Sequence, residues 1–167
     1  MQAKAHHTKA ETNGLEPTEV SYLSSLTQNI QNNRTDTPKK HRRVLLVEDN
    51  IASLLVARSL LERLSCEVDV AETARAAFNF DKQSRYDIIF LDLDLPDLDG
   101  VSVCQSIRSK TGKNQFTPII ALSSRSAEQE KPACLAAGMN AYMEKPAFLA
   151  HFAQMMDLYI LPQTTIS

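Results

Sequence analysis

The sequence predicts an α/β domain in which five parallel strands alternate with five helices. Three observations support this prediction. Short apolar runs, such as those at 44–48, 87–91 and 117–122, are nearly continuous, as expected for strands buried on both faces. Segments with apolar residues at helical spacing lie between the runs, and Asn, Thr or Gly marks several of the transitions. Alternation of this kind produces right-handed βαβ units and a parallel sheet.

The first half of the pattern gives two strands and two helices. VLLVE at 44–48 is predicted to be a buried strand, and Asn50 caps a helical pattern that continues through Leu64. CEVDVA at 66–71 alternates between apolar and polar residues, which predicts an edge strand with one wet face. Thr73 then begins a second helix.

The second half begins with DIIFL at 87–91, another buried run, and Gly100 precedes a third helix. TPIIAL at 117–122 is the fourth strand. NAYME at 140–144 is a short fifth strand, and residues 147–160 repeat apolar side chains at helical spacing. These assignments complete the alternation.

The fourth helix is the irregular element. Residues 126–137 have a helical composition, and Gly138 is a suitable C-cap. Pro132 lies within this segment, and a regular helix accepts proline only in its first turn. We therefore expect this helix to begin late, near residue 129, or to be kinked.

The edge position of the second strand determines the simplest strand order. With that strand outside, the order is 2-1-3-4-5, which is a doubly wound sheet. Ligands bind such sheets at the carboxyl ends of the strands, where the order reverses. Here that point lies between the first and third strands.

Polar residues follow four of the strands, and their carboxyl ends share one rim of the sheet. Clustered carboxylates raise one another's pKa unless a cation neutralises them, and Mg²⁺ suits a few carboxylates together with water and phosphate. A lysine and hydroxyls beside them could bind phosphoryl oxygens. The residues are Glu48 and Asp49 after the first strand, Asp92 after the third, Ser123 and Ser124 after the fourth, and Lys145 after the fifth.

Five aspartates crowd the stretch DIIFLDLDLPDLDG at 87–100. Asp92 directly follows the buried strand, so it is the best placed to act as a nucleophile that forms an acyl phosphate. Asp97 and Asp99 are typical of a turn that begins with proline, and Asp87 of a solvent-exposed strand start. Taken singly, the acids of the rim could be helix caps, and the lysine an ordinary surface residue. Their joint occurrence at four strand ends favours a functional site.

The motifs VLLVEDN, DIIFLDLDLPDLDG, PIIALSS and AGMNAYMEKP resemble, in order and spacing, those of a response-regulator receiver domain of two-component and phosphorelay signalling. The resemblance covers about residues 43–160 and is greatest to the receivers of hybrid sensor kinases. It implies the flavodoxin-like (βα)5 fold. It also implies that the domain is a phosphoacceptor rather than an enzyme with an external substrate, apart from Mg²⁺-dependent self-phosphorylation and dephosphorylation.

The resemblance assigns roles to the rim. Asp92 would accept a phosphoryl group from a phosphohistidine on a histidine kinase or a histidine phosphotransfer protein. Asp49, Asp92 and the backbone carbonyl of Asp94 would ligate Mg²⁺, and Glu48 would act through water. Lys145 would bind the phosphoryl group, as a catalytic partner of Asp92.

The resemblance also implies a conformational switch. Ser123 corresponds to the switch hydroxyl and Tyr142 to the switch aromatic. Ser124, where alanine is usual, would join Ser123 and Lys145 in binding the phosphoryl group. The bond from Lys145 to Pro146 would be cis. Phosphorylation would change the face formed by the fourth helix, the fifth strand and the fifth helix, to which a downstream protein would bind.

Two other functions fit parts of the pattern. Asp92 and Asp94 have the spacing of a haloacid-dehalogenase-like phosphatase, although the acidic pair at 48–49 precedes them here, whereas that family places its metal-binding acids later. Loss of phosphomonoester turnover in Asp94→Asn would favour that alternative. A degenerate receiver that only binds partners is the second, and the intact acidic triad with Lys145 argues against it.

The remaining sequence limits the context of the domain. Residues 1–42 are polar and predicted to be mostly disordered, with a short helix near 17–31 that either docks a partner or is frayed without one. We expect a receiver domain over 43–161, a short tail over 162–167 and no DNA-binding effector. The basic run KKHRR at 39–43 is short and contains no aromatic residue, so no nucleic acid is expected. The sequence has no signal peptide, no apolar run approaching the roughly 18 residues of a membrane span, and three widely spaced cysteines, which together predict a cytoplasmic protein.

Overall fold

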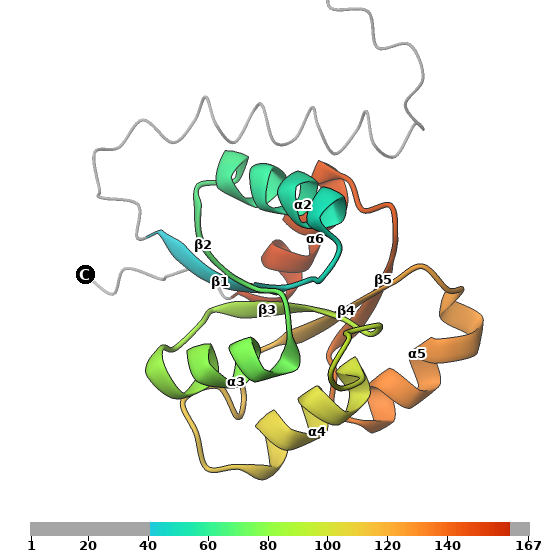
Figure 1. The fold of residues 1–167 in the computed structure, drawn as a ribbon. Coiled ribbons are helices and arrows are strands. Elements are labelled where there is room, and N and C mark those ends of the chain that lie inside the picture. Colours follow the sequence, from blue (N-terminus) through green and yellow to red (C-terminus); the bar gives the residue numbers. More distant parts are fainter. Residues whose placement is uncertain (1–40, 161–167) are drawn as a thin grey trace, which may run out of the picture. The chain divides into compact units, whose positions relative to one another are not determined.

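The computed structural model describes residues 41–160, which form a parallel sheet covered by helices on both faces (Figure 1). The possible helix near 17–31 and the tails lie outside the described residues. In chain order the elements are β1 (Arg42–Val47), α2 (Ile51–Arg63), β2 (Cys66–Ala71), α3 (Ala74–Gln83), β3 (Ile88–Asp92), α4 (Gly100–Ser109), β4 (Ile119–Ser123), α5 (Ala127–Ala136), β5 (Ala141–Glu144) and α6 (Leu149–Tyr159).

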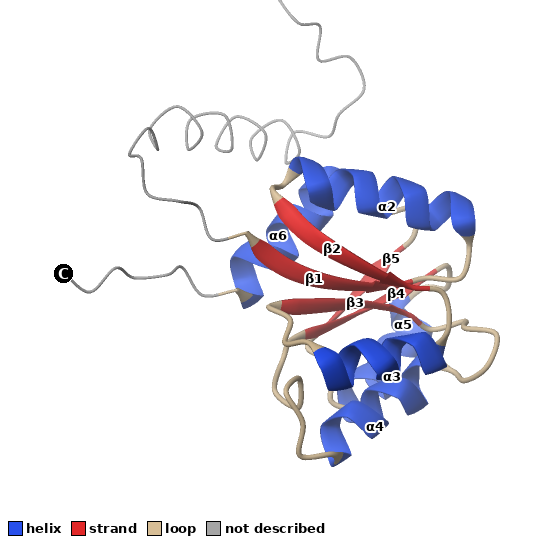
Figure 2. Cartoon of the chain, turned by 60° about the vertical axis from the view of Figure 1, so that its left-hand side comes forward, coloured by secondary structure: helices blue, strands red, loops and turns tan. Residues whose placement is uncertain are grey.

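The predicted strand order is confirmed. The strands lie in the order β2-β1-β3-β4-β5, and every neighbouring pair is parallel. Helices α2 and α6 cover one face, and α3, α4 and α5 cover the other (Figures 1 and 2). The fold is therefore a doubly wound, flavodoxin-like sheet, and its strand order reverses between β1 and β3.

The alternating side chains of the strands build two separate core layers. Leu45, Ile89 and Leu91 belong to the layer under α3, α4 and α5, whereas Leu46 and Phe90 belong to the layer under α2 and α6. All five residues of β3 are buried, as predicted for a strand covered on both faces. Full burial of a large aliphatic or aromatic side chain contributes about 1.5–3 kcal/mol, so the central strands are firmly held.

Helix caps fix where several helices begin. Asn50 caps α2 and Thr73 caps α3, as predicted, and each side chain accepts a bond from the backbone N–H three residues later. Asp99, interpreted from the sequence as a turn residue, caps α4 by accepting the N–H of Ser102 at 2.9 Å. Gly100 is consequently the first residue of that helix.

Helix α5 differs from its prediction at its start. It begins at Ala127, two residues before the predicted start near residue 129, and Pro132 is its sixth residue. The earlier start has a tertiary cause, because the carboxylate of Glu144 on β5 accepts the N–H of Ala127 at 2.7 Å. The predicted start near residue 129 is therefore two residues late, because no pattern in the sequence indicates this contact with the neighbouring strand. The other form of the prediction, a kink at Pro132, stays a prediction.

Two further expectations concern the chemistry of the chain. Cys66, Cys104 and Cys134 are free and buried, in agreement with reduced core thiols. Among residues 41–160, no helix combines the length and the apolarity that crossing a bilayer requires.

Candidate functional site

The carboxyl ends of β1, β3 and β5 bring the predicted charged residues together. The Nζ atom of Lys145 lies 2.6 Å from Oδ2 of Asp92 and 2.6 Å from Oε2 of Glu48. One carboxylate oxygen from each of Glu48, Asp49 and Asp92 lies within 4.8 Å of the other two. Three carboxylates therefore surround a position that the single ammonium group of Lys145 also reaches.

The backbone around Asp92 holds its carboxylate in place. The N–H of Asp94 donates to Oδ1 of Asp92 at 3.0 Å, while Lys145 occupies Oδ2. The turn that follows packs closely against the end of β3, because Gly100 donates its N–H to the carbonyl of Leu93. A Cβ at Gly100 would lie 2.5 Å from the carbonyl oxygen of Asp92, so only glycine fits there.

Lys145 directly follows β5 and is positioned by a backbone contact with β4. Its backbone N–H donates to the carbonyl of Ser123 at 2.7 Å, which fixes the end of β5 against the end of β4. The bond between Lys145 and Pro146 is cis, as the resemblance implies.

The buried charges of the site shift each other's pKa. Burial and the nearby Asp92 carboxylate raise the pKa of Glu48 above its usual value, although Lys145 opposes them. Burial also acts to raise the pKa of Asp92, but hydrogen bonds from Lys145 and from the Asp94 N–H outweigh it and lower that pKa. Burial acts to lower the pKa of Lys145, and the two carboxylates raise it instead. Asp92 is therefore ionised at neutral pH, as a nucleophile requires.

The remaining predicted residues lie beside this cluster. Ser123 is the last residue of β4 and is fully buried, whereas Ser124 is exposed. Tyr142 lies on β5, and its hydroxyl donates to the carbonyl of Arg125 at 2.7 Å. The hydroxyl of Ser123 donates to Oε2 of Glu130, at 2.7 Å.

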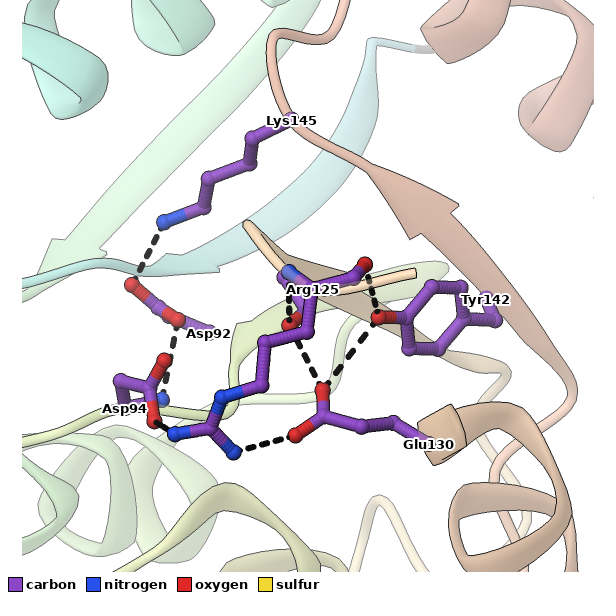
Figure 3. A network of polar contacts seen from close by, with 7 residues as sticks. Asp92, Asp94, Arg125, Glu130, Tyr142 and Lys145 are labelled. Atoms are coloured by element: carbon purple, nitrogen blue, oxygen red, sulfur yellow. Dashed lines mark hydrogen bonds and ion pairs between the residues drawn. The ribbon is translucent and has the colours of Figure 1, made fainter. Parts of the chain in front are cut away.

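The sequence did not indicate that Arg125 and Glu130 belong to the site. The guanidinium of Arg125 pairs with Oε1 of Glu130 and, at 2.9 Å, with Oδ1 of Asp94. Figure 3 shows the resulting run of contacts from Lys145 through Asp92 and Asp94 to Arg125, Glu130 and Tyr142. Glutamate near a helix start is ordinary, so the sequence held no signal for this contact.

The donor set of the acidic cluster fits a hard divalent cation. Its atoms are carboxylate oxygens, which Mg²⁺ prefers together with water and phosphate. Lys145 supplies one positive charge beside three carboxylates. The cluster therefore has an excess of negative charge, which a bound cation would neutralise.

Residues 44–157 match the response regulator receiver domain family. Over 111 residues the chain is 37% identical to the aerobic respiration control sensor protein ArcB of Escherichia coli K12, a match that covers 66% of this chain and 14% of that protein. It is 36% identical over 116 residues to the sensor protein GacS of Pseudomonas syringae pv. syringae, covering 68% and 13%. The chain thus spans only about a seventh of the length of these relatives.

Two solved structures show the same fold. The receiver domain of the sensor histidine kinase PA1611 from Pseudomonas aeruginosa PAO1, with a magnesium ion coordinated in its active site cleft, has a TM-score of 0.67 and 33% sequence identity. That likeness covers 72% of this chain and 98% of the other. The chemotaxis response regulator CheY4 of Vibrio cholerae also has a TM-score of 0.67, at 23% identity, covering 72% and 99%.

These findings distinguish between the functions that the sequence left open. The match to the receiver family spans both the acidic pair at 48–49 and Lys145, and it supports the receiver interpretation over the phosphatase alternative. The strand order and the joint position of the acids and the lysine agree with it. This chain belongs to the response regulator receiver domain family, whose members are phosphoacceptor domains of signalling systems.

Proposed function

We propose that Asp92 accepts a phosphoryl group from a phosphohistidine of a histidine kinase or a histidine phosphotransfer protein. A carboxylate oxygen of Asp92 attacks the phosphorus, and the P–N bond breaks with its electron pair going to the ring nitrogen. The histidine leaves as neutral imidazole, because its other ring nitrogen carries a proton. The observation that carries this proposal is the position of Asp92, which is buried and whose carboxylate lies 2.6 Å from the ammonium group of Lys145. The lowered pKa of Asp92 favours the ionised form that attacks.

Asp49, Asp92 and the backbone carbonyl of Asp94 are the proposed Mg²⁺ ligands, and Glu48 contributes through water. Such an ion supplies positive charge to the phosphoryl oxygens and to the carboxylates that crowd them. Lys145 binds a phosphoryl oxygen from its own side of the site, and Ser123 donates a hydrogen bond to another. The same arrangement serves self-phosphorylation by small phosphodonors and the later loss of the phosphoryl group.

Phosphorylation is proposed to act on other proteins by changing one face of the domain. Ser123 moves toward the phosphoryl group and Tyr142 turns inward, so that the face formed by α5, β5 and α6 changes shape and binds a downstream protein. The matched relatives include sensor proteins of bacteria and a histidine kinase of rice, which supports a place in a phosphorelay, where the phosphoryl group passes onward.

Intact mass spectrometry after incubation with acetyl phosphate and Mg²⁺ tests the proposal. We expect a mass gain of about 80 Da, that of HPO₃, in the wild type. The gain should vanish in Asp92→Asn and when Mg²⁺ is removed with a chelator. Asp87→Asn is the matched control, because it makes the same chemical change at the other end of β3. Unchanged labelling of Asp92→Asn would contradict the assignment of Asp92 as the phosphoacceptor.

A further inference from the structure

The switch hydroxyl is already engaged in this structure. Ser123 is buried, and its Oγ donates to Oε2 of Glu130 at 2.7 Å while accepting the backbone N–H of Arg125 at 3.1 Å. A serine hydroxyl carries a single proton. The hydroxyl therefore cannot donate to Glu130 and to a phosphoryl oxygen on Asp92 at the same time.

Glu130 is itself held in position by an ion pair and lies beside Tyr142. Its Oε1 pairs with the guanidinium of Arg125, and its Oε2 lies 3.3 Å from the hydroxyl of Tyr142. Its side chain is only 16% exposed. Burial acts to raise the pKa of Glu130, but the Ser123 hydroxyl and Arg125 outweigh it and lower that pKa, so the acceptor is an ionised carboxylate. Hydrogen bonds to ionised groups are roughly twice as strong as neutral ones.

The geometry points to a role for Glu130 that rests on the proposed function of Asp92. We propose that Glu130 is a positioning residue that competes with the phosphoryl group for the Ser123 hydroxyl and so stabilises the unphosphorylated arrangement. Phosphorylation shifts the switch only by as much as the phosphoryl group binds Ser123 better than Glu130 does.

The competition extends to the proposed output face. Glu130 lies on α5 and Tyr142 on β5, and both belong to the network that Ser123 must leave. Because coupling between two sites is reciprocal, a partner that draws Glu130 away from Ser123 favours phosphorylation of Asp92.

Beryllofluoride with Mg²⁺, a stable stand-in for the phosphoryl group, provides the test. The apparent Kd is measured for the wild-type chain, for Glu130→Ala and for Glu128→Ala. Glu128 is the matched control, because it is an exposed glutamate two residues earlier in α5 and its loss changes the charge equally. We expect Glu130→Ala to bind about tenfold more tightly than the wild type, since a hydrogen bond to a charged group no longer competes. Glu128→Ala should match the wild type.

A double-mutant cycle shows whether Glu130 acts through Ser123. In the Ser123→Ala background the tightening caused by Glu130→Ala should disappear. If it persists, Glu130 acts by another route, such as the release of Arg125, and the proposal is overturned. Glu130→Gln, which keeps a neutral acceptor, should give an intermediate Kd and provides a second variant if the alanine variant does not fold.

The outcomes separate this inference from the proposed function. A wild-type chain that does not bind beryllofluoride in the presence of Mg²⁺ contradicts both. A wild-type chain that binds it, with Glu130→Ala no tighter than Glu128→Ala, overturns the role of Glu130 alone.

Discussion

Both ends of the parallel sheet contain buried polar groups, but the two ends differ in how these groups are paired. Toward the amino end, the half-buried carboxylate of Asp69 in β2 accepts bonds from the guanidinium of Arg43 at 3.0 Å and from the hydroxyl of Tyr86 at 2.7 Å. At the carboxyl end, Glu48 and Asp92 both contact Lys145, with Asp49 nearby.

Asn114 is the centre of the amino end. Its side chain is fully buried, and its amide nitrogen donates to the carbonyl of Ser84 at 2.8 Å and to the carboxylate of Asp81 at 2.9 Å. Its amide oxygen accepts the backbone N–H of Tyr86 at 2.8 Å and the hydroxyl of Thr117 at 3.2 Å. Both ends of this side chain are therefore satisfied.

The contrast teaches that burial of polar groups alone does not mark a functional site. A network whose donors and acceptors are matched contributes to stability and specificity of the fold. A buried cluster with more negative than positive charge lowers the stability of the fold, and the rest of the fold must offset this loss. Such clusters are typical of binding and catalytic sites. Two buried carboxylates that share one lysine, with a third carboxylate oxygen within 4.8 Å, distinguish the carboxyl end of this sheet from the amino end.

The sharpest test of the contrast removes the lysine of the carboxyl end. We expect Lys145→Ala to slow phosphorylation by acetyl phosphate roughly a hundredfold or more, since loss of one group that stabilises developing charge has such an effect. The rate of mass gain at fixed donor and Mg²⁺ concentrations measures it.

The control for this experiment is a lysine of the amino end. Lys113 is exposed, and its Nζ donates to the carbonyl of Gln83 at 2.8 Å, far along the chain from the cluster. Lys113→Ala should be phosphorylated at the wild-type rate. If the two variants slow equally, net charge rather than the position of Lys145 governs the reaction.

The second test removes the centre of the amino end. We expect Asn114→Ala to lower the free energy of unfolding by about 3 kcal/mol, because several buried donors and acceptors lose their partners. Urea denaturation measures this change. At temperatures where the variant is folded, its phosphorylation rate should equal that of the wild type.

Gln105→Ala, the loss of an exposed amide on α4, is the matched control and should leave the stability nearly unchanged. A slower phosphorylation rate in Asn114→Ala than in the wild type, at a temperature where the variant is folded, would contradict the separation of the two ends.

The sequence predicted the parts of the molecule that repeat or that lie at strand ends. The strands β1, β3 and β4 were predictable because burial on both faces requires nearly continuous apolar runs. Glu48, Asp92 and Lys145 could be placed on one rim because the carboxyl ends of parallel strands always share an edge of the sheet.

The contacts between side chains of distant elements could not be predicted. The pairing of Arg125 with Asp94 joins two loops, and the bond from Asn114 to Asp81 joins a loop to α3. Neither has a local pattern, because each depends on the direction of a side chain after the sheet has formed. The early start of α5, which Glu144 fixes from β5, was missed for the same reason.

The last test concerns an acid at the carboxyl end that behaves like those of the amino end. The carboxylate of Asp97 accepts the backbone N–H of Ala74 at 2.8 Å and that of Arg75 at 3.0 Å, so it caps α3 from another loop. These two bonds lower its pKa. Because the pKa is lower in the folded than in the unfolded chain, the stabilisation is present above the usual pKa of aspartate and is lost as the pH falls through the folded value.

Asp97→Asn keeps an acceptor but removes the charge, so we expect its melting temperature to be slightly lower than that of the wild type at neutral pH. The difference should begin to close as the pH falls below about 4, the usual pKa of aspartate, and should vanish below the lowered pKa of folded Asp97, where the wild-type carboxyl is protonated too. The phosphorylation rate should not change, because this carboxylate is satisfied by backbone donors and contributes nothing to the excess of negative charge around Asp92. A slower rate in Asp97→Asn would place Asp97 with the functional acids, and the balance of charge would then fail to distinguish structural from functional carboxylates within one end of the sheet.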